Sequence, residues 1–387
     1  MSSFSHHSHH SHHSHHSHHS HHSHHSHHSQ HAAGDGSPML SAALGQTAEA
    51  ILGYWDGKPD GTETRYPAGS AQDMGAPETI AALAALEPNA LANVLLQEAM
   101  GLFAVAPGAD KGEVAVALQG QALLTIRPPS LAALTAQLAP LRAAADLRAD
   151  RLSEIIAQQT DLLSFFGALY KLDWARRRWT MVLLEAVLRC VIAQEMRIKF
   201  FCKTLRPIDL SPQVQPIIQT PGHSSYISGH STESFAIATV LSVLQGGSLA
   251  AVVALLEKDL PAQGAAAAVD RVPLLPFRLA ERIADNRTVA GVHFPTDSAG
   301  GAVTGITLAA AMIAHLAGEG PVAGWSIDGA GWAGDFTLTG LRAALATGTG
   351  THPVAGIARG PAAVPAAKAP PHSALGTVWQ AARAEWA

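Results

Sequence analysis

The sequence predicts an all-α fold of buried core helices, with at most a small β-hairpin. Hydrophobic residues make up 47% of the 387 residues, and long segments carry them at the three- and four-residue spacing of amphipathic helices. One stretch, 113–126, instead alternates apolar and small or polar residues as a half-buried strand does. Charged residues are 14% of the chain, against about 25% in an ordinary soluble domain, so a large apolar core can form.

Helical periodicity and turn-forming residues place the elements in order along the chain. The predicted helices cover 79–100 with an interruption at Pro88, 130–147, 150–169, 174–200, the segment from Ser228 to Gly246, 248–260, 277–289, 295–317, 341–346 and 374–387. In the hairpin, Val114, Val116 and Leu118 alternate before a turn at Gln119-Gly120. Loops fill the proline-rich stretch 201–227 and most of the chain after 320.

Composition divides the chain into four parts. Residues 1–37 hold 17 of the 23 histidines in a Ser-His-His repeat that has no apolar face, and we interpret them as an affinity tag and linker. A natural metal-buffering tail is the alternative. The other predicted parts are a mainly helical region at 38–170, a catalytic helical bundle at 171–320 and a loop-rich extension at 321–387.

Charge and cysteine content exclude several classes of protein. A net charge of −5 argues against a generally basic nucleic-acid-binding protein. Two cysteines, Cys190 and Cys202, are too few for a disulfide framework or a cysteine-based zinc site, and they leave the redox compartment open.

Two apolar stretches resemble membrane spans, but we interpret both as core helices of a soluble protein. Residues 235–256 contain no charged residue, and Gln245-Gly246-Gly247-Ser248 divides them into two short helices. Residues 298–316 are rich in glycine and alanine and therefore only weakly apolar. The helix at 174–200 carries Glu185, Arg189, Glu195 and Arg197, which a spanning segment rarely tolerates.

Three polar clusters, in a fixed order, carry the chemistry. In the first, Lys199 and Arg206-Pro207 lie where a helix runs into a loop, and two cations there suit an anion with several oxygens. Taken alone, this cluster is more typical of a solvated helix end.

The second cluster is Ser228-Gly229-His230 at the start of a helix. Ser228 can cap the helix, Gly229 lets a backbone N–H approach an oxyanion, and His230 is placed to exchange a proton with a group bound there. An ordinary helix cap beside an incidental surface histidine is the alternative.

The third cluster runs from Arg287 through His293 to Asp297, between two predicted helices. Asp297 is near enough in sequence to accept a hydrogen bond from one nitrogen of the His293 ring, which leaves the other as a ligand or nucleophile. A buried histidine bonded to a helix-capping aspartate is the alternative.

Together the three clusters predict an oxyanion cage, which we define as Lys199, Arg206, Ser228, Gly229, Arg287 and the two histidines His230 and His293. In a chain so poor in charge, three gathered cations require a bound anion.

In order and spacing, the clusters resemble the signature of the superfamily of type 2 phosphatidic acid phosphatases and vanadium haloperoxidases. That signature is Lys, six residues, Arg-Pro; then Pro-Ser-Gly-His; then Ser-Arg, five residues, His, three residues, Asp. Ile227 replaces the proline and Asn286 the serine, and neither lost residue contacts the anion in the family. The resemblance covers about a quarter of the chain and implies two packed helical bundles.

The resemblance also implies a role for each matching residue. His293 binds vanadium through a ring nitrogen, or is the phosphorylated nucleophile in a phosphatase. The equatorial oxygens of vanadate, or of phosphate in its place, are held by Lys199, Arg206, Ser228, Gly229 and Arg287. His230 is the general acid/base, and Lys199 polarises the bound peroxide. Asp297 and His223 do not bind the anion themselves but contact the residues that do.

Four features favour a soluble, bacterial-type haloperoxidase. The chain shows no convincing transmembrane bundle, it has well over one hundred residues before Lys199, and the segment from Gly291 to Asp297 is similar to bacterial haloperoxidases. His223 stands where similar bromoperoxidases carry histidine and chloroperoxidases an aromatic residue. Against these four features, Met196 stands three residues before Lys199, where chloroperoxidases carry tryptophan. The resemblance therefore implies oxidation of bromide or iodide by hydrogen peroxide and halogenation of a small organic substrate. It implies no membrane or nucleic-acid partner and is compatible with a homodimer. A soluble acid phosphatase and a non-catalytic oxyanion-binding protein are the alternatives.

Overall fold

The computed structural model describes residues 38–47, 79–257, 274–347, 356–360 and 363–387. The predicted tag and linker at 1–37 lie outside the described residues. The helices are α1 (Pro38–Thr47), α2 (Ile80–Ala85), α3 (Pro88–Met100), α4 (Leu131–Ala136), α5 (Leu138–Ala144), α6 (Arg148–Ala157), α7 (Leu163–Tyr170), α8 (Arg178–Cys202), α9 (Pro207–Leu210), α10 (Gly229–Gly246), α11 (Leu249–Glu257), α13 (Leu275–Val289), α14 (Pro295–Ala317), α15 (Leu338–Thr347) and α16 (Ala374–Ala384). The strands are β1 (Phe103–Pro107), β2 (Val114–Leu118), β3 (Gln121–Arg127), β4 (Trp325–Asp328) and β5 (Ile357–Arg359). The predicted mainly helical class is confirmed.

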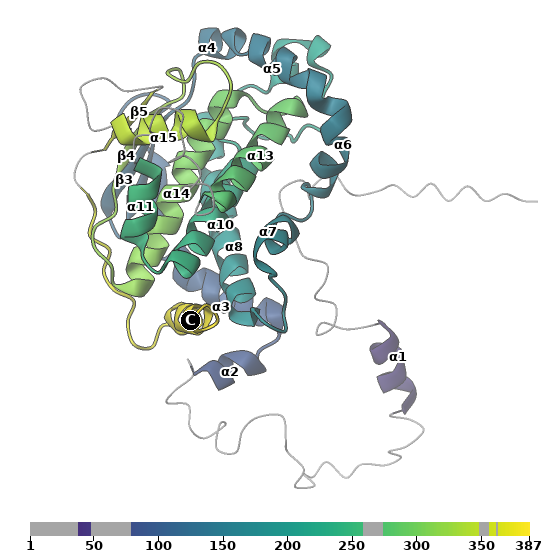
Figure 1. The fold of residues 1–387 in the computed structure, drawn as a ribbon, viewed down its shortest axis with the longest axis vertical. Coiled ribbons are helices and arrows are strands. Elements are labelled where there is room, and N and C mark those ends of the chain that lie inside the picture. The colour runs from purple at the N-terminus through teal and green to yellow at the C-terminus, as the bar shows by residue number, and fades with distance from the viewer. Residues whose placement is uncertain (1–37, 48–78, 258–273, 348–355, 361–362) are drawn as a thin grey trace, which may run out of the picture.

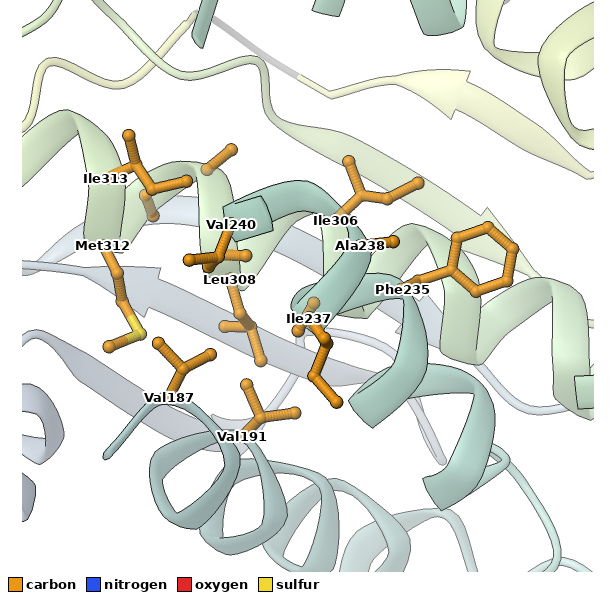
Figure 2. Packing of buried hydrophobic residues seen from close by; sticks show 14 of the residues in the cluster. Val187, Val191, Phe235, Ile237, Ala238, Val240, Ile306, Leu308, Met312 and Ile313 are labelled. Carbon is orange, nitrogen blue, oxygen red and sulfur yellow. The ribbon is translucent and has the colours of Figure 1, made fainter. Parts of the chain in front are cut away.

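Helices α8, α10, α13 and α14 form the centre of the molecule, with α4 to α7 along one side of α13 (Figure 1). Apolar side chains of three of these helices meet in the core: Figure 2 shows Val187 and Val191 of α8, Ile237 of α10, and Leu308 and Met312 of α14. All five are at most 1% exposed. This packing fixes the N-terminal ends of α10 and α14, which carry two of the three polar clusters.

Small residues let α10 and α14 approach closely. A Cβ atom on Gly301 would lie 2.6 Å from the backbone oxygen of Ser228, and one on Gly305 would overlap the backbone oxygen of Thr232. Ser231 donates to the backbone oxygen of Ser298 over 2.6 Å, which adds a polar link between the helices. The two glycines of α14 are therefore needed for packing.

Replacing Gly305 by alanine is expected to lower the free energy of unfolding by about 2 kcal/mol or more, because the new methyl group meets backbone that cannot move aside. Gly246, at the end of α10, faces open space, so Gly246→Ala is the matched control and should be neutral or slightly stabilising. Urea unfolding of both variants measures the difference. Equal stability of the two variants would contradict this packing.

The predicted hairpin is present as β2 and β3. Its turn residues Gln119 and Gly120 have φ values of 49° and 83°, the backbone that a two-residue hairpin turn requires. The hairpin belongs to a five-stranded sheet in the order β1-β2-β3-β4-β5, in which β4 pairs parallel to β3. Strands β4 and β5 arise from a region that we expected to be loop, because segments of four and three residues are too short to show alternation.

Two predicted helices are each divided in the structure. The helix expected over 130–147 breaks at Gln137, whose buried amide donates to the backbone oxygen of Trp332 and accepts from the backbone of Thr296. The helix expected over 150–169 breaks after Ala157, and Gln158 just beyond it is fully buried. Tertiary hydrogen bonds override the periodicity at both breaks. The N-terminal helices share the main hydrophobic core, since Leu95 and Phe166 belong to it.

Among the described residues, α14 is long and apolar enough to cross a membrane, and 94% of its apolar window is buried inside the fold. Helices α10 and α11 pass the same test only as a pair, and they are bent by 120° at their junction.

Candidate active site

The three polar clusters converge where α10 and α14 begin. The backbone N–H of Ser228 donates to the backbone oxygen of Asp297 over 2.9 Å, so these two helix ends lie side by side. Lys199 is in the last turn of α8, Arg206 directly precedes α9, and Arg287 is near the end of α13. The residues at the centre of the cluster are at most 5% exposed: Lys199, Arg206, Ser228, His230, Arg287, His293 and Asp297.

His293 is held through both ring nitrogens. Its Nδ1 lies 3.0 Å from Oδ2 of Asp297, as the spacing of the two residues predicted. The guanidinium Nη1 of Arg206 lies 3.1 Å from Nε2. Because an arginine can only donate, Nε2 is the acceptor and the ring proton is on Nδ1, directed at Asp297. The Nε2 atom of His293 is therefore unprotonated and faces the guanidinium of Arg206.

Asp297 accepts two further hydrogen bonds besides the one from Nδ1 of His293. Its Oδ2 accepts from the backbone N–H of Phe294 at 2.9 Å and from the hydroxyl of Ser225 at 2.5 Å. Burial raises the pKa of this carboxyl to about 6, although these hydrogen bonds oppose the shift. Asp297 thus remains largely ionised at neutral pH and holds the His293 ring in one orientation. No sequence motif indicated that Ser225 takes part.

Arg206 connects His293 to the loop before α10. It donates to the backbone oxygen of Val292 at 2.8 Å and to that of His223 at 3.0 Å, and its Nη2 lies 3.1 Å from Nδ1 of His223. Its own backbone N–H donates to Asp209 at 2.8 Å. Burial lowers the pKa of Arg206 to about 10, so it is still charged at neutral pH. Burial, with Lys199 and Arg206 nearby, lowers the pKa of His223 to about 3, so that ring is neutral.

His230 and Arg287 lie together on the other side of the cluster. Nε2 of His230 is 2.8 Å from the backbone oxygen of Gln158, so that nitrogen carries the proton and Nδ1 is unprotonated. Arg287 donates to the backbone oxygen of Ile155 at 3.1 Å and to Oε1 of Gln158 at 3.0 Å. Burial, together with the nearby Arg287 cation, holds the pKa of His230 well below its usual range.

Gln158 has a part in this arrangement that the sequence did not indicate. Its Oε1 also accepts from the amide of Asn286 at 3.0 Å. The sequence had left open which carboxylate orients His230, with Asp209 among the candidates. The structure places a backbone carbonyl next to His230, and Asp209 bonds Arg206 instead.

Residues 179–318 match the family model of the PAP2 superfamily, and all three clusters lie within this range. These residues form a PAP2 superfamily domain. The superfamily includes vanadium haloperoxidases and type 2 phosphatidic acid phosphatases, which agrees with the resemblance seen in the sequence. No curated protein matches the chain with significant similarity.

Ser228 does not cap α10 in this PAP2 domain, which corrects one expectation. No hydrogen bond joins its side chain to the first turn, and its buried Oγ lacks a hydrogen-bond partner among the described residues. Nε of Arg287 is also buried and without one. Such orphaned donors are costly in a folded protein unless a ligand satisfies them. Together with the buried cations Lys199 and Arg206 of the same site, they fit a tetrahedral oxyanion.

Two hollows reach the PAP2 site. A cavity of about 20 Å³, room for one water, is lined by His230, Arg287 and His293. A basin of about 520 Å³ is lined by Arg206, His223 and Lys203. Pro221 lines both, so the loop before α10 lies between the basin and the smaller cavity. Binding of an oxyanion therefore requires side chains such as Arg206 to exchange a protein partner for the ligand.

Proposed function

We propose that this PAP2 domain is a vanadate-dependent haloperoxidase that uses hydrogen peroxide to oxidise bromide or iodide to hypohalous acid. The main support is the set of three buried cations, of which Arg206 lies 3.1 Å from Nε2 of His293, together with the orphaned donors of Ser228 and Arg287. Vanadate, when bound, would supply a Lewis acid that activates peroxide without changing its own oxidation state.

Each residue of the oxyanion cage has a distinct task in this proposal. His293 would bind the vanadium through Nε2, since Asp297 already orients the ring. Lys199, Arg206 and Arg287 would neutralise the oxygens, with the Ser228 hydroxyl and the N–H of Gly229 as further donors. The unprotonated Nδ1 of His230 would accept a proton from peroxide. Lys199 would polarise the peroxide, so that a halide can attack one of its oxygens.

The proposal also names the reaction partners of the protein and the medium in which it acts. The partners are hydrogen peroxide, a halide and a small organic acceptor that would enter by the basin beside Arg206 and His223. We infer that the protein acts in aqueous solution, because the apolar window of α14 is 94% buried by the rest of the fold.

A soluble acid phosphatase is the second candidate, favoured by the same unprotonated Nε2 of His293. Nε2 would attack phosphorus and form a phosphohistidine, while the alcohol leaves with a proton supplied through His230. Water would then cleave the phosphohistidine and release inorganic phosphate. A binding protein without catalysis is the third candidate, and it predicts oxyanion affinity with no turnover.

Bromination of monochlorodimedone by the full chain, with vanadate, peroxide and bromide, separates these candidates. We expect turnover that requires both vanadate and peroxide. Hydrolysis of p-nitrophenyl phosphate without bromination would assign the chain to the phosphatases. Binding of phosphate or vanadate without either activity would leave the binding protein.

A further inference from the structure

Two carboxylates are buried beside the oxyanion cage and belong to none of the three clusters. Glu195 is 0% exposed and Glu233 is 1% exposed. A buried carboxylate is normally paired and fully hydrogen-bonded. Here Oε2 of Glu195 and Oε1 of Glu233 have no hydrogen-bond partner among the described residues. A task other than structural pairing therefore needs to be found for them.

The two carboxylates line the interface between α8 and α10. Glu195 and Lys199 are one turn apart on α8, with 3.4 Å between Oε1 and Nζ. A Cβ on Gly229 would lie 2.6 Å from Oε1 of Glu195, so this carboxylate abuts the first turn of α10. Glu233 is four residues after Gly229 and thus on the same face of α10. Lys199 and Gly229, two expected oxygen-binding positions, are therefore each one helical turn from one of the two acids, and Glu195 is close to both positions.

The charges of the site make this pair unusual. Lys199 on α8, Arg206 before α9 and Arg287 on α13 supply three positive charges. Glu195, Glu233 and Asp297 supply three negative ones when all are ionised. His230, on α10, is neutral. A doubly charged oxyanion added to this balance would leave a large negative charge in a buried site, which is unfavourable.

Protonation of the acids removes this excess. Burial raises the pKa of both Glu195 and Glu233, and the repulsion between them raises that of Glu233 further, while Lys199 opposes the shift in both. Arg206 opposes it at Glu195, and Arg287 does so at Glu233. An anion bound by these cations would cancel their effect and favour the protonated acids.

We propose that Glu195 and Glu233 act as a buried acid pair that takes up one proton when an oxyanion binds to the cage. In this step the proton goes from solvent to a carboxylate oxygen, and no bond of the oxyanion changes. The acid pair would act as positioning residues, since both influence the ligand through Lys199. The inference rests on the proposed oxyanion site, but not on the choice between haloperoxidase and phosphatase.

The proposal sets the pH dependence of binding. If one proton is taken up per oxyanion, the affinity falls about tenfold for each pH unit between the pKa of the acid pair in the free protein and its higher pKa in the complex. Replacing Glu233 by glutamine removes one of the two titrating groups and the repulsion between them. The variant should therefore bind with much weaker pH dependence and more tightly than the wild type at alkaline pH.

Calorimetry with inorganic phosphate and the full chain tests this directly. At a pH where phosphate is a dianion, titrations in two buffers of different ionisation enthalpy count the protons taken up. We expect about one for the wild type and about none for Glu233→Gln. Glu185→Gln is the matched control, because Glu185 is also on α8 but pairs with Arg189 at 2.7 Å. It should behave as the wild type.

The outcomes separate the two proposals. Phosphate binding without proton uptake, or with the same uptake in Glu233→Gln, would overturn the acid pair and leave the oxyanion site intact. Failure of the wild type to bind either phosphate or vanadate would overturn both. If Glu233→Gln does not fold, Glu195→Gln tests the same proton count from the α8 side of the pair.

Discussion

Replacing His230 by alanine is expected to reduce turnover by about 10³-fold while changing oxyanion affinity only a few-fold. General acid–base groups contribute about 10²- to 10⁴-fold to rates, and His230 is the buried imidazole beside Arg287 that is not held by Asp297. The oxyanion would still meet Lys199 and Arg287, so its binding should persist. The reduction is expected for bromination and for phosphate-ester hydrolysis alike, because both reactions need a proton moved at this position.

The measurement compares kcat with the affinity for vanadate or phosphate in the same preparation. His315→Ala is the matched control, since His315 lies at the far end of α14 and contacts the backbone oxygen of Ala367. Its kcat should be unchanged. Turnover that survives in His230→Ala would remove His230 from the reaction and direct attention to His223. Loss of affinity as large as the loss of kcat would give His230 a binding role instead.

The starts of the main helices could be predicted because local chemistry fixes them. Pro295 occupies the first position of α14, where a missing N–H costs nothing. Ser228 also marks the start of α10, although its side chain makes no capping hydrogen bond there. The contact between His293 and Asp297 could also be expected, since only three residues separate them at a helix start. These features depend on residues that are near each other in the chain.

The remaining features depend on long-range contacts that no local pattern encodes. Gln158 lies inside a segment with helical periodicity, yet it ends α6 and bonds Arg287, 129 residues later. From the sequence, Glu195 is one of four charged residues that make 174–200 unsuitable for a membrane, and nothing distinguishes it from the other three, none of which is buried. It is fully buried because α10 covers that side of α8. The proposed acid pair thus appears only after the helices are packed.

Replacing Arg287 by methionine is expected to lower phosphate affinity by about 100-fold, the loss of one or two charge-assisted hydrogen bonds. Arg287 is 1% exposed, and burial lowers its pKa to about 10, so it remains charged at neutral pH. An oxyanion near its unpartnered Nε would stabilise this charge. A ligand at 100 times its Kd stabilises a folded protein by about 2.7 kcal/mol, which raises Tm measurably.

Thermal unfolding with and without phosphate therefore separates a binding role from a packing role. Arg342→Met is the matched control, because Arg342 is also buried, at 2% exposed, and donates to the backbone oxygen of Leu255 away from the site. Both variants lose hydrogen bonds to backbone carbonyls, so both should be less stable without ligand. Only Arg287→Met should lose the rise in Tm that phosphate causes. A full rise in Arg287→Met would mean that the oxyanion binds elsewhere, and the three buried cations would then be balanced by Glu195, Glu233 and Asp297 alone.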